Sequence, residues 1–166
     1  MLFLSVNSTV FGSFQAPDRI IYSGKEYKLF GYPLESFFAK YPDKRPKVEI
    51  ISTGLWRGYI ATFEIKDNQL FLKDIEIQIS TKDEKGNHIN SWKSVLNDVF
   101  PNQELVKVDW ITELLKFSSE RYASSSMYDY TLLEIDNGNL KKVLCTEIGK
   151  LKSIDVVIPS IPPISR

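Results

Sequence analysis

Three segments of the sequence place a short polar turn between two runs in which apolar residues alternate with polar ones. In residues 130–144 the turn contains Asn137 and Gly138, a pair that readily adopts the positive φ angles of a two-residue hairpin turn. The other two segments are residues 20–29 and residues 59–79. Three hairpins of this kind predict a mostly antiparallel β-sheet.

The second hairpin has two further features. Its alternation changes parity between Leu72 and Ile75, which predicts a β-bulge near Lys73 and Asp74. Its sequence around the turn, residues 64–70, also resembles residues 134–140 of the third hairpin. Duplication of half a domain is one interpretation, but we favour similar turn chemistry in two similar hairpins.

Two segments have apolar residues at helical spacing. Residues 33–41 are bounded by prolines and place three apolar side chains on one helical face: Leu34, Phe37 and Phe38. Residues 90–99 begin at Asn90, a good N-cap, and place four apolar side chains on one stripe: Trp92, Val95, Leu96 and Val99. With the hairpins, these segments predict an α+β fold: a mostly antiparallel β-sheet with two short helices.

Composition excludes several classes of protein and site. The 166 residues suit one domain, and 21 basic residues balance 21 acidic ones, which argues against nucleic-acid binding. The chain has one cysteine and one histidine, Cys145 and His88, too few for a typical zinc site. It contains no nucleotide-binding glycine motif, calcium loop or apolar run long enough to span a membrane. We therefore predict no cofactor, no metal and no transmembrane segment.

The two ends of the chain differ in composition from the residues between them. Residues 1–12 are apolar, and we interpret them either as a truncated secretory signal or as a first strand. Residues 13–157 form the predicted β-rich domain, and residues 158–166 an extended, proline-rich tail. Residues 118–127 are polar and serine-rich, which predicts an exposed loop. The sequence favours neither the cytoplasm nor export to the periplasm or medium.

One segment combines residue types that are common in binding sites. Trp56, Arg57 and Tyr59 lie close together in a segment that also contains Gly54 and Gly58. Arginine offers a planar fork of donors for carboxylate or phosphate, and tryptophan and tyrosine are frequent at binding hot spots. The alternative is structural, with the two aromatic side chains packed in the core and the arginine reaching the surface. The predicted binding residues are Trp56, Arg57 and Tyr59.

A second hypothesis is a hydrolase that uses carboxylates on strands. Such chemistry needs two carboxyl groups across a cleft, with pKa values that differ. The candidates are Glu64, Glu76, Asp109 and Glu134, but Glu64 and Glu76 alternate with apolar residues and are expected to face solvent. Cys145 follows apolar residues in a predicted strand, so we interpret it as a buried side chain and not as a nucleophile. We therefore predict no catalytic residues.

Residues 51–75 resemble a stretch shared by a family of uncharacterised bacterial proteins, with the pattern ISTxLWRGYxATFEIxxxxLFLxDI. Flanking pieces within residues 17–142 also fit this family. The resemblance implies no established activity, cofactor or catalytic residue. Some similar proteins begin with signal peptides, which favours the secretory interpretation of residues 1–12.

The sequence as a whole predicts a non-enzymatic binding module, with a protein as its partner. The observations behind this prediction are the Trp56, Arg57 and Tyr59 cluster, the 13% aromatic content and the absence of catalytic signatures. The alternatives are the carboxylate hydrolase and an exported structural protein of the cell envelope. The identity of the partner, the oligomeric state and the order of the strands are left open.

Overall fold

The computed structural model describes residues 15–118, 130–147 and 150–155. The predictions for residues 1–12 and for the tail lie outside these ranges. So does the predicted serine-rich loop apart from Ser118, which ends a strand.

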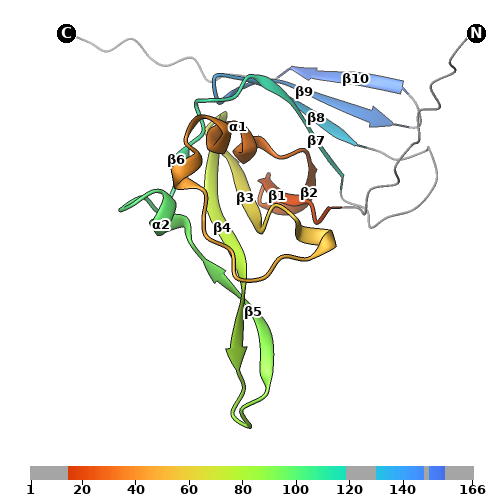
Figure 1. The fold of residues 1–166 in the computed structure, drawn as a ribbon. Helices are drawn as coiled ribbons and strands as arrows, with labels where there is room; N and C mark the ends of the chain where they lie inside the picture. The colour runs from red at the N-terminus through yellow and green to blue at the C-terminus, as the bar shows by residue number, and fades with distance from the viewer. Residues whose placement is uncertain (1–14, 119–129, 148–149, 156–166) are drawn as a thin grey trace, which may run out of the picture.

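The described residues form a β-sheet with few helices (Figure 1). The strands are β1 (Asp18–Tyr22), β2 (Lys25–Phe30), β3 (Tyr59–Lys66), β4 (Gln69–Lys82), β5 (His88–Ser94), β6 (Val106–Lys107), β7 (Glu113–Ser118), β8 (Thr131–Asp136), β9 (Asn139–Glu147) and β10 (Lys150–Asp155). The helices are α1 (Pro33–Lys40) and α2 (Leu96–Val99), with 3-10 turns η1 (Pro42–Lys44) and η2 (Thr53–Leu55). This confirms the predicted α+β class.

The main path of the sheet has the order β10-β9-β8-β7-β2-β1-β3-β4-β5, and β6 pairs with β4 off this path. Neighbouring strands are antiparallel except for β1 and β3, which are parallel. The three predicted hairpins are confirmed as β1–β2, β3–β4 and β8–β9. The predicted bulge is also confirmed, because Lys73 lies unpaired between Leu72, opposite Phe63, and Asp74, opposite Thr62.

The turns of the second and third hairpins lie side by side, because the sheet curls until β4 meets β9 at Gln69 and Asn139. The two turns exchange backbone hydrogen bonds. The Leu70 N–H donates to the Gly138 carbonyl, and the Leu140 N–H donates to the Asn68 carbonyl, each over 2.8 Å. In the alignment of the two hairpins, Leu70 corresponds to Leu140 and Asn68 to Gly138, so each hydrogen bond is the counterpart of the other. The similar sequences therefore accompany a local, approximate two-fold relation between the turns.

One predicted helix is wrong over most of its length. Residues 88–94 form strand β5, and only Leu96–Val99 is helical. Strand β5 pairs with residues 76–82 of β4, and Trp92 is 43% exposed, so it does not lie on a buried helical stripe. The hydrogen-bonding edge that β4 offers outweighs the local helical spacing in these residues.

The core lies between the inner face of the curled sheet and α1. Helix α1 begins at Pro33, as predicted, and buries four of its side chains, which are those of Pro33, Leu34, Phe37 and Phe38. Phe38 packs edge-on against Tyr59 of β3, and Phe37 packs against Phe100 and Trp110. Within the described residues, no helix has the length and apolar character needed to cross a membrane.

Candidate functional site

Trp56, Arg57 and Tyr59 lie on the turn that leads from η2 into β3. The turn closes through hydrogen bonds from the Leu55 N–H to the Ser52 carbonyl and from the Gly58 N–H to the Leu55 carbonyl, each 2.9 Å. Gly58 has a φ of +81°, and a Cβ atom there would lie 2.3 Å from Cγ1 of Val48. Glycine is therefore required at position 58, and the next residue enters the sheet directly.

The structure separates the three predicted binding residues. Trp56 is 59% exposed, whereas Arg57 is 3% exposed and Tyr59 is fully buried. The structural alternative placed both aromatic side chains in the core and the arginine at the surface. It is right for Tyr59 and wrong for the other two, because Trp56 faces solvent and Arg57 lies in the interior. Of the three side chains, Trp56 is the one that a partner reaches without any opening of the fold.

Arg57 is held inside by an ion pair with Asp18, the first residue of β1. The Arg57 Nη1 atom lies 3.0 Å from Asp18 Oδ1, and both side chains are fully buried. The same carboxylate oxygen accepts a hydrogen bond from the Ala61 N–H of β3, and Arg57 Nη2 donates to the Ala16 carbonyl over 2.6 Å. The pair therefore ties the turn to the parallel strands β1 and β3.

Aromatic rings cover the guanidinium group of Arg57. Its Cζ atom lies 3.7 Å from the ring centroid of Tyr32 and 5.3 Å from that of Tyr59, at distances favourable for cation–π contact. Tyr59 donates its hydroxyl to Glu35 Oε1 over 2.6 Å, and Arg45 donates to Glu35 Oε2 over 2.6 Å. We call these contacts, together with the Asp18–Arg57 ion pair, the Arg57 network. They connect the turn to α1 and to the loop that follows α1.

Gln15 and Ala16, which precede β1 and which we call the Gln15 strap, hold the turn from its other side. The Trp56 N–H donates to Gln15 Oε1 over 3.0 Å, and Gln15 Nε2 donates to the Thr53 carbonyl over 2.7 Å. The Ala16 N–H donates to the Gly54 carbonyl over 2.7 Å. The backbone that presents Trp56 is therefore fixed by hydrogen bonds on both sides.

Three groups of the Arg57 network, Asp18, Tyr59 and Glu35, have altered pKa values. Burial raises the pKa of Asp18 from 3.8 to about 6, against the opposing influence of Arg57 and the Ala61 N–H. Burial and the hydrogen bond to Glu35 raise the pKa of Tyr59 well above its usual range. Burial also acts to raise the pKa of Glu35, but hydrogen bonds from Arg45 and Tyr59 bring it below its usual value. The network therefore holds one buried carboxylate that titrates in mildly acidic solution.

The free energy of unfolding is expected to fall as the pH rises from about 4 to about 6 through the titration of Asp18. Because the folded-state pKa of about 6 lies above 3.8, folded Asp18 keeps a proton that the unfolded chain has released. The stabilisation is complete below about pH 4 and lost above about pH 6, and a shift of about two units corresponds to about 3 kcal/mol. Urea denaturation at several pH values between about 4 and about 6 should show this fall for the wild type and not for Asp18→Asn. The same pH dependence of the unfolding free energy in both chains would contradict the prediction.

Of the four carboxylates of the hydrolase hypothesis, Glu64 and Glu76 lie apart on the sheet, and the other two are exposed. Glu64 and Glu76 were expected to face solvent, but both are partly buried. Glu64 forms an ion pair with Lys73, and Glu76 forms one with Arg19. Glu76 lies opposite Ile60, and Glu64 lies four positions beyond Ile60 along β3, so the Cα atoms of Ile60 and Glu64 are about 13 Å apart. Glycosidases hold their two carboxyl groups about 5–9.5 Å apart. Asp109 and Glu134 are exposed. This geometry does not favour the hydrolase hypothesis.

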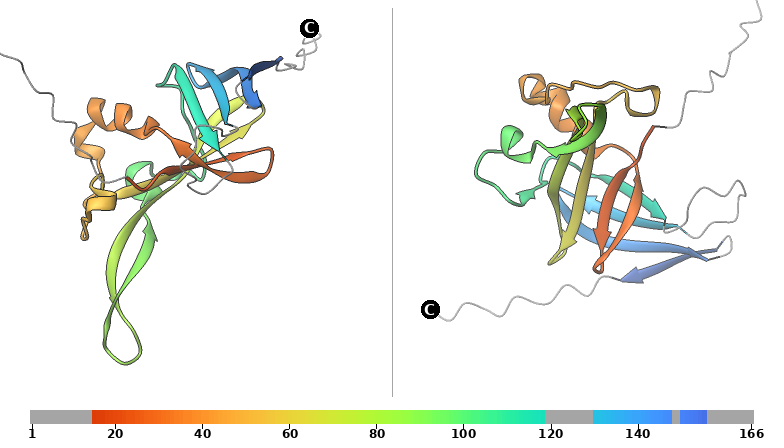
Figure 2. Two further views of the ribbon diagram at one scale, coloured as in Figure 1. Left: turned by 90° about the vertical axis from the view of Figure 1, so that its right-hand side faces the viewer. Right: turned by 90° about the horizontal axis from the view of Figure 1, so that it is seen from below.

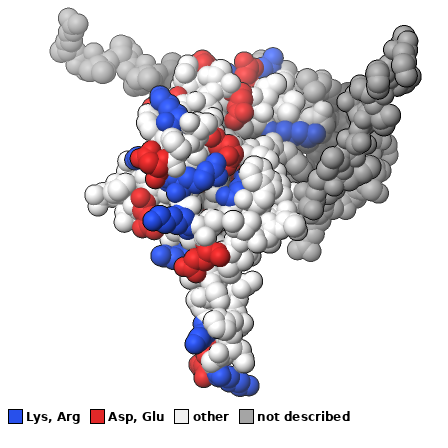
Figure 3. All heavy atoms as spheres, viewed as in Figure 1, with Lys and Arg blue, Asp and Glu red and all other residues white. Residues whose placement is uncertain are grey.

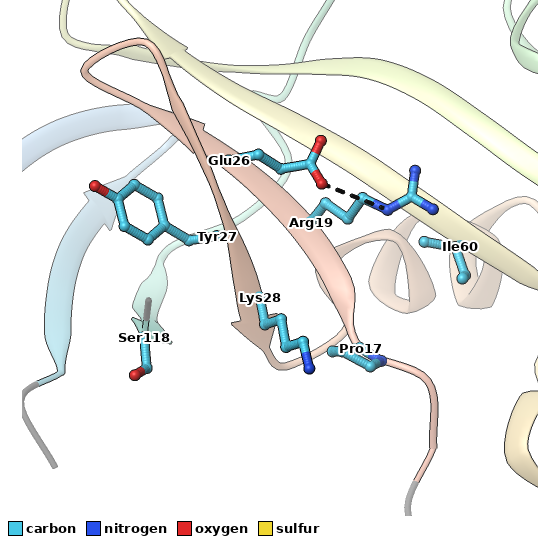
Figure 4. A pocket seen from close by; sticks show the side chains of 7 residues that line it. All are labelled: Pro17, Arg19, Glu26, Tyr27, Lys28, Ile60 and Ser118. Carbon is cyan, nitrogen blue, oxygen red and sulfur yellow. Dashed lines mark ion pairs between the residues drawn. The ribbon is translucent and has the colours of Figure 1, made fainter. Parts of the chain in front are cut away.

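A shallow pocket of about 450 Å³ lies on the outer face of β1 and β2 (Figure 4). Its lining residues are Pro17, Arg19, Glu26, Tyr27, Lys28, Ile60 and Ser118. Arg19 lies 3.9 Å from Glu26 inside the pocket and 2.7 Å from Glu76 beside it. The pocket contains none of the predicted binding residues, so it is separate from the Arg57 network.

Asp18, Tyr32, Glu35 and Arg45 belong to the Arg57 network, and sequence reasoning did not single them out. Asp18 and Arg57 lie 39 positions apart, and no local pattern joins them. In the part of the chain that the structure describes, no three His, Cys, Asp or Glu side chains are grouped to hold a metal ion. Comparisons with protein-family models, with curated proteins and with solved structures gave no significant match.

Proposed function

We propose that the protein is a non-enzymatic binding module that docks a protein partner at the surface around Trp56. The observation that supports this most strongly is the exposure of Trp56 on a turn that the Arg57 network and the Gln15 strap hold in place. A large apolar side chain that is 59% exposed gains free energy when a partner covers it. Because the turn is already ordered, little conformational entropy is lost on binding.

Two other exposed apolar side chains lie on segments next to this turn in the sequence or in contact with Arg57. Ile51, which is 67% exposed, comes shortly before η2, and Tyr32, which is 36% exposed, lies against the guanidinium of Arg57. We propose that Tyr32, Ile51 and Trp56 contribute to one binding surface, which we call the Trp56 surface. Tryptophan and tyrosine are enriched at the centres of protein interfaces, where a few residues supply most of the binding free energy.

The charge of the chain also favours a protein partner over nucleic acid. The formal net charge is zero, and acidic and basic side chains are mixed across the face shown in Figure 3. Nucleic-acid binding depends on a concentration of basic groups that neutralise phosphates. The alternative of an exported envelope protein depends on residues 1–12, which lie outside the described residues.

Replacing Trp56 by alanine is expected to remove the partner while leaving the fold intact. Truncation of a hot-spot residue weakens binding by at least about 2 kcal/mol, or about thirty-fold. We would immobilise the wild-type chain and the Trp56→Ala chain and capture proteins from an extract of the organism that encodes it. A partner at one-to-one stoichiometry should be retained by the wild type and lost by the variant.

Trp92→Ala is the matched control, because Trp92 is 43% exposed but lies on β5 and not on the turn that carries Trp56. This control should keep the partner. Loss of the partner from both variants, or from neither, would contradict the proposed surface. A partner that is a nucleic acid, detected by nuclease treatment of the captured material, would contradict the proposed class.

A further inference from the structure

Strands β4 and β5 continue beyond the body of the molecule as a two-stranded arm (Figures 1 and 2). Ile77 is the β4 residue nearest the tip that pairs with β3, and residues 78–92, which we call the arm, extend past it. Six of the seven β5 residues are exposed, and Ser91 is intermediate. An isolated two-stranded hairpin is marginally stable in water. The arm therefore gains stability if further strands or side chains cover it.

The outer edge of β5 has few of the features that usually prevent strand pairing. Among the described strands β5 pairs with β4 alone, and the register of that pairing is continuous, with no bulge. Natural edge strands are protected by prolines, bulges or several charges. Strand β5 has no proline, and Lys93 is its single Lys, Arg, Asp or Glu residue. Ile89 and Trp92 on this strand are 46% and 43% exposed.

We propose that β5 pairs antiparallel with β5 of a second copy of this chain. The proposal goes beyond the protein-binding function proposed above. Centring the two-fold axis on Ser91 uses all seven residues of the strand, from His88 to Ser94. Ser91 then lies opposite Ser91 of the second copy, and the two arms form one four-stranded sheet between two bodies. The free edge of β4 is a poorer candidate, because its unpaired part covers only Gln78–Lys82.

The side chains of β5 complement those of a second β5 in this register. Lys93 lies opposite Ile89 of the second copy, so the alkyl chain of the lysine covers an exposed apolar group and no like charges face each other. Trp92 lies opposite Asn90 of the second copy, which places the two Trp92 side chains on one face as diagonal neighbours. Diagonal neighbours are about 7–8 Å apart, within reach of aromatic side chains.

The distribution of charge also permits two copies to approach. The formal net charge of the chain is zero, so two copies do not repel each other at long range. The arm carries its charged side chains mainly at the tip, where Lys82 and Lys85 lie among Asp83 and Glu84. Figure 3 shows both signs at the tip and a mainly uncharged surface between the tip and the body. A second copy is therefore a better match for β5 than a strongly charged partner.

The test is the mass of the purified chain by sedimentation equilibrium. One strand pair buries less than the ~1,600 Å² of a standard interface, so we expect a weak dimer with a dissociation constant of about 10–100 μM. Ser91→Lys places two cations against each other on the axis and should leave a monomer. Thr81→Lys is the matched control, since Thr81 shares the face of Ser91 but lies on β4, and should still dimerise.

A crosslinking variant tests the position of the axis independently. In Ser91→Cys, with Cys145 replaced by serine, a short bis-maleimide should join two chains, whereas Ser80→Cys in the same background should not be joined. Ser80 lies on β4, opposite Asn90 of the same chain. A wild-type monomer at about 0.5 mM would overturn the proposal. Equal dimerisation of Ser91→Lys and Thr81→Lys, or equal crosslinking at the two cysteine positions, would also overturn it.

Discussion

Arg57→Ala is expected to lower the free energy of unfolding by about 3–5 kcal/mol, because it leaves a buried carboxylate without its counter-charge. Asp18 and Arg57 are both fully buried, and Asp18 Oδ1 accepts from Arg57 Nη1 over 3.0 Å. The variant also removes the group that lies against the rings of Tyr32 and Tyr59. Urea denaturation at neutral pH, where Asp18 of the wild type is mostly ionised, measures the loss directly.

Lys141→Ala is the control for this prediction. Lys141 lies 3.6 Å from Asp136, but both side chains are 46% exposed, and exposed ion pairs contribute about 0–1 kcal/mol. A similar small change in both variants would mean that the Asp18–Arg57 pair is not buried as described. The loss in Arg57→Ala should become smaller below about pH 6, because protonation of Asp18 removes the unpaired charge.

Gly138→Ala is expected to lower the free energy of unfolding by about 3 kcal/mol or more, since strain and overlap add at this position. Gly138 has a φ of +74°, and a Cβ atom there would lie 1.8 Å from the Val108 carbonyl oxygen. The turn cannot move away easily, because the Gly138 N–H donates to the Ile111 carbonyl and its own carbonyl accepts from the Leu70 N–H. Thermal and urea unfolding measure the effect.

Gly24→Ala separates the two causes of that loss. Gly24 has nearly the same φ, +75°, but an added Cβ atom would have no neighbour within 4 Å. This variant should therefore show the conformational cost alone, about 1–2 kcal/mol. If the two variants were equally destabilised, the close contact of Gly138 with the Val108 carbonyl would be contradicted.

Local chemistry was sufficient to predict the hairpins, the bulge and the first helix. Asn137 and Gly138 adopt φ angles of +46° and +74°, as the turn residues indicated, and Pro33 begins α1. Residues 90–94 were predicted wrongly, because their apolar spacing fits a helix while the unpaired edge of β4 binds them as a strand. The parallel pairing of β1 with β3 and the contact of β4 with β9 join distant segments, and no local pattern indicates them.

The candidate site was predicted only in part for the same reason. The sequence drew attention to residues 54–59, but the positions of Trp56 and Arg57 depend on Asp18, which makes a buried arginine tolerable. Without that distant carboxylate, the expected arrangement is an arginine at the surface and a tryptophan in the core. Because Arg57→Ala is expected to destabilise the fold, Trp56→Ala is the appropriate variant for binding experiments.

The central claim is that the Trp56 surface binds a protein partner, and calorimetric titration of the purified partner into wild type, Trp56→Ala and Trp92→Ala tests it most directly. We predict that Trp56→Ala weakens binding by about thirty-fold or more, that Trp92→Ala does not, and that all three chains unfold at similar urea concentrations. Equal affinity of the wild type and Trp56→Ala for the partner would contradict the claim.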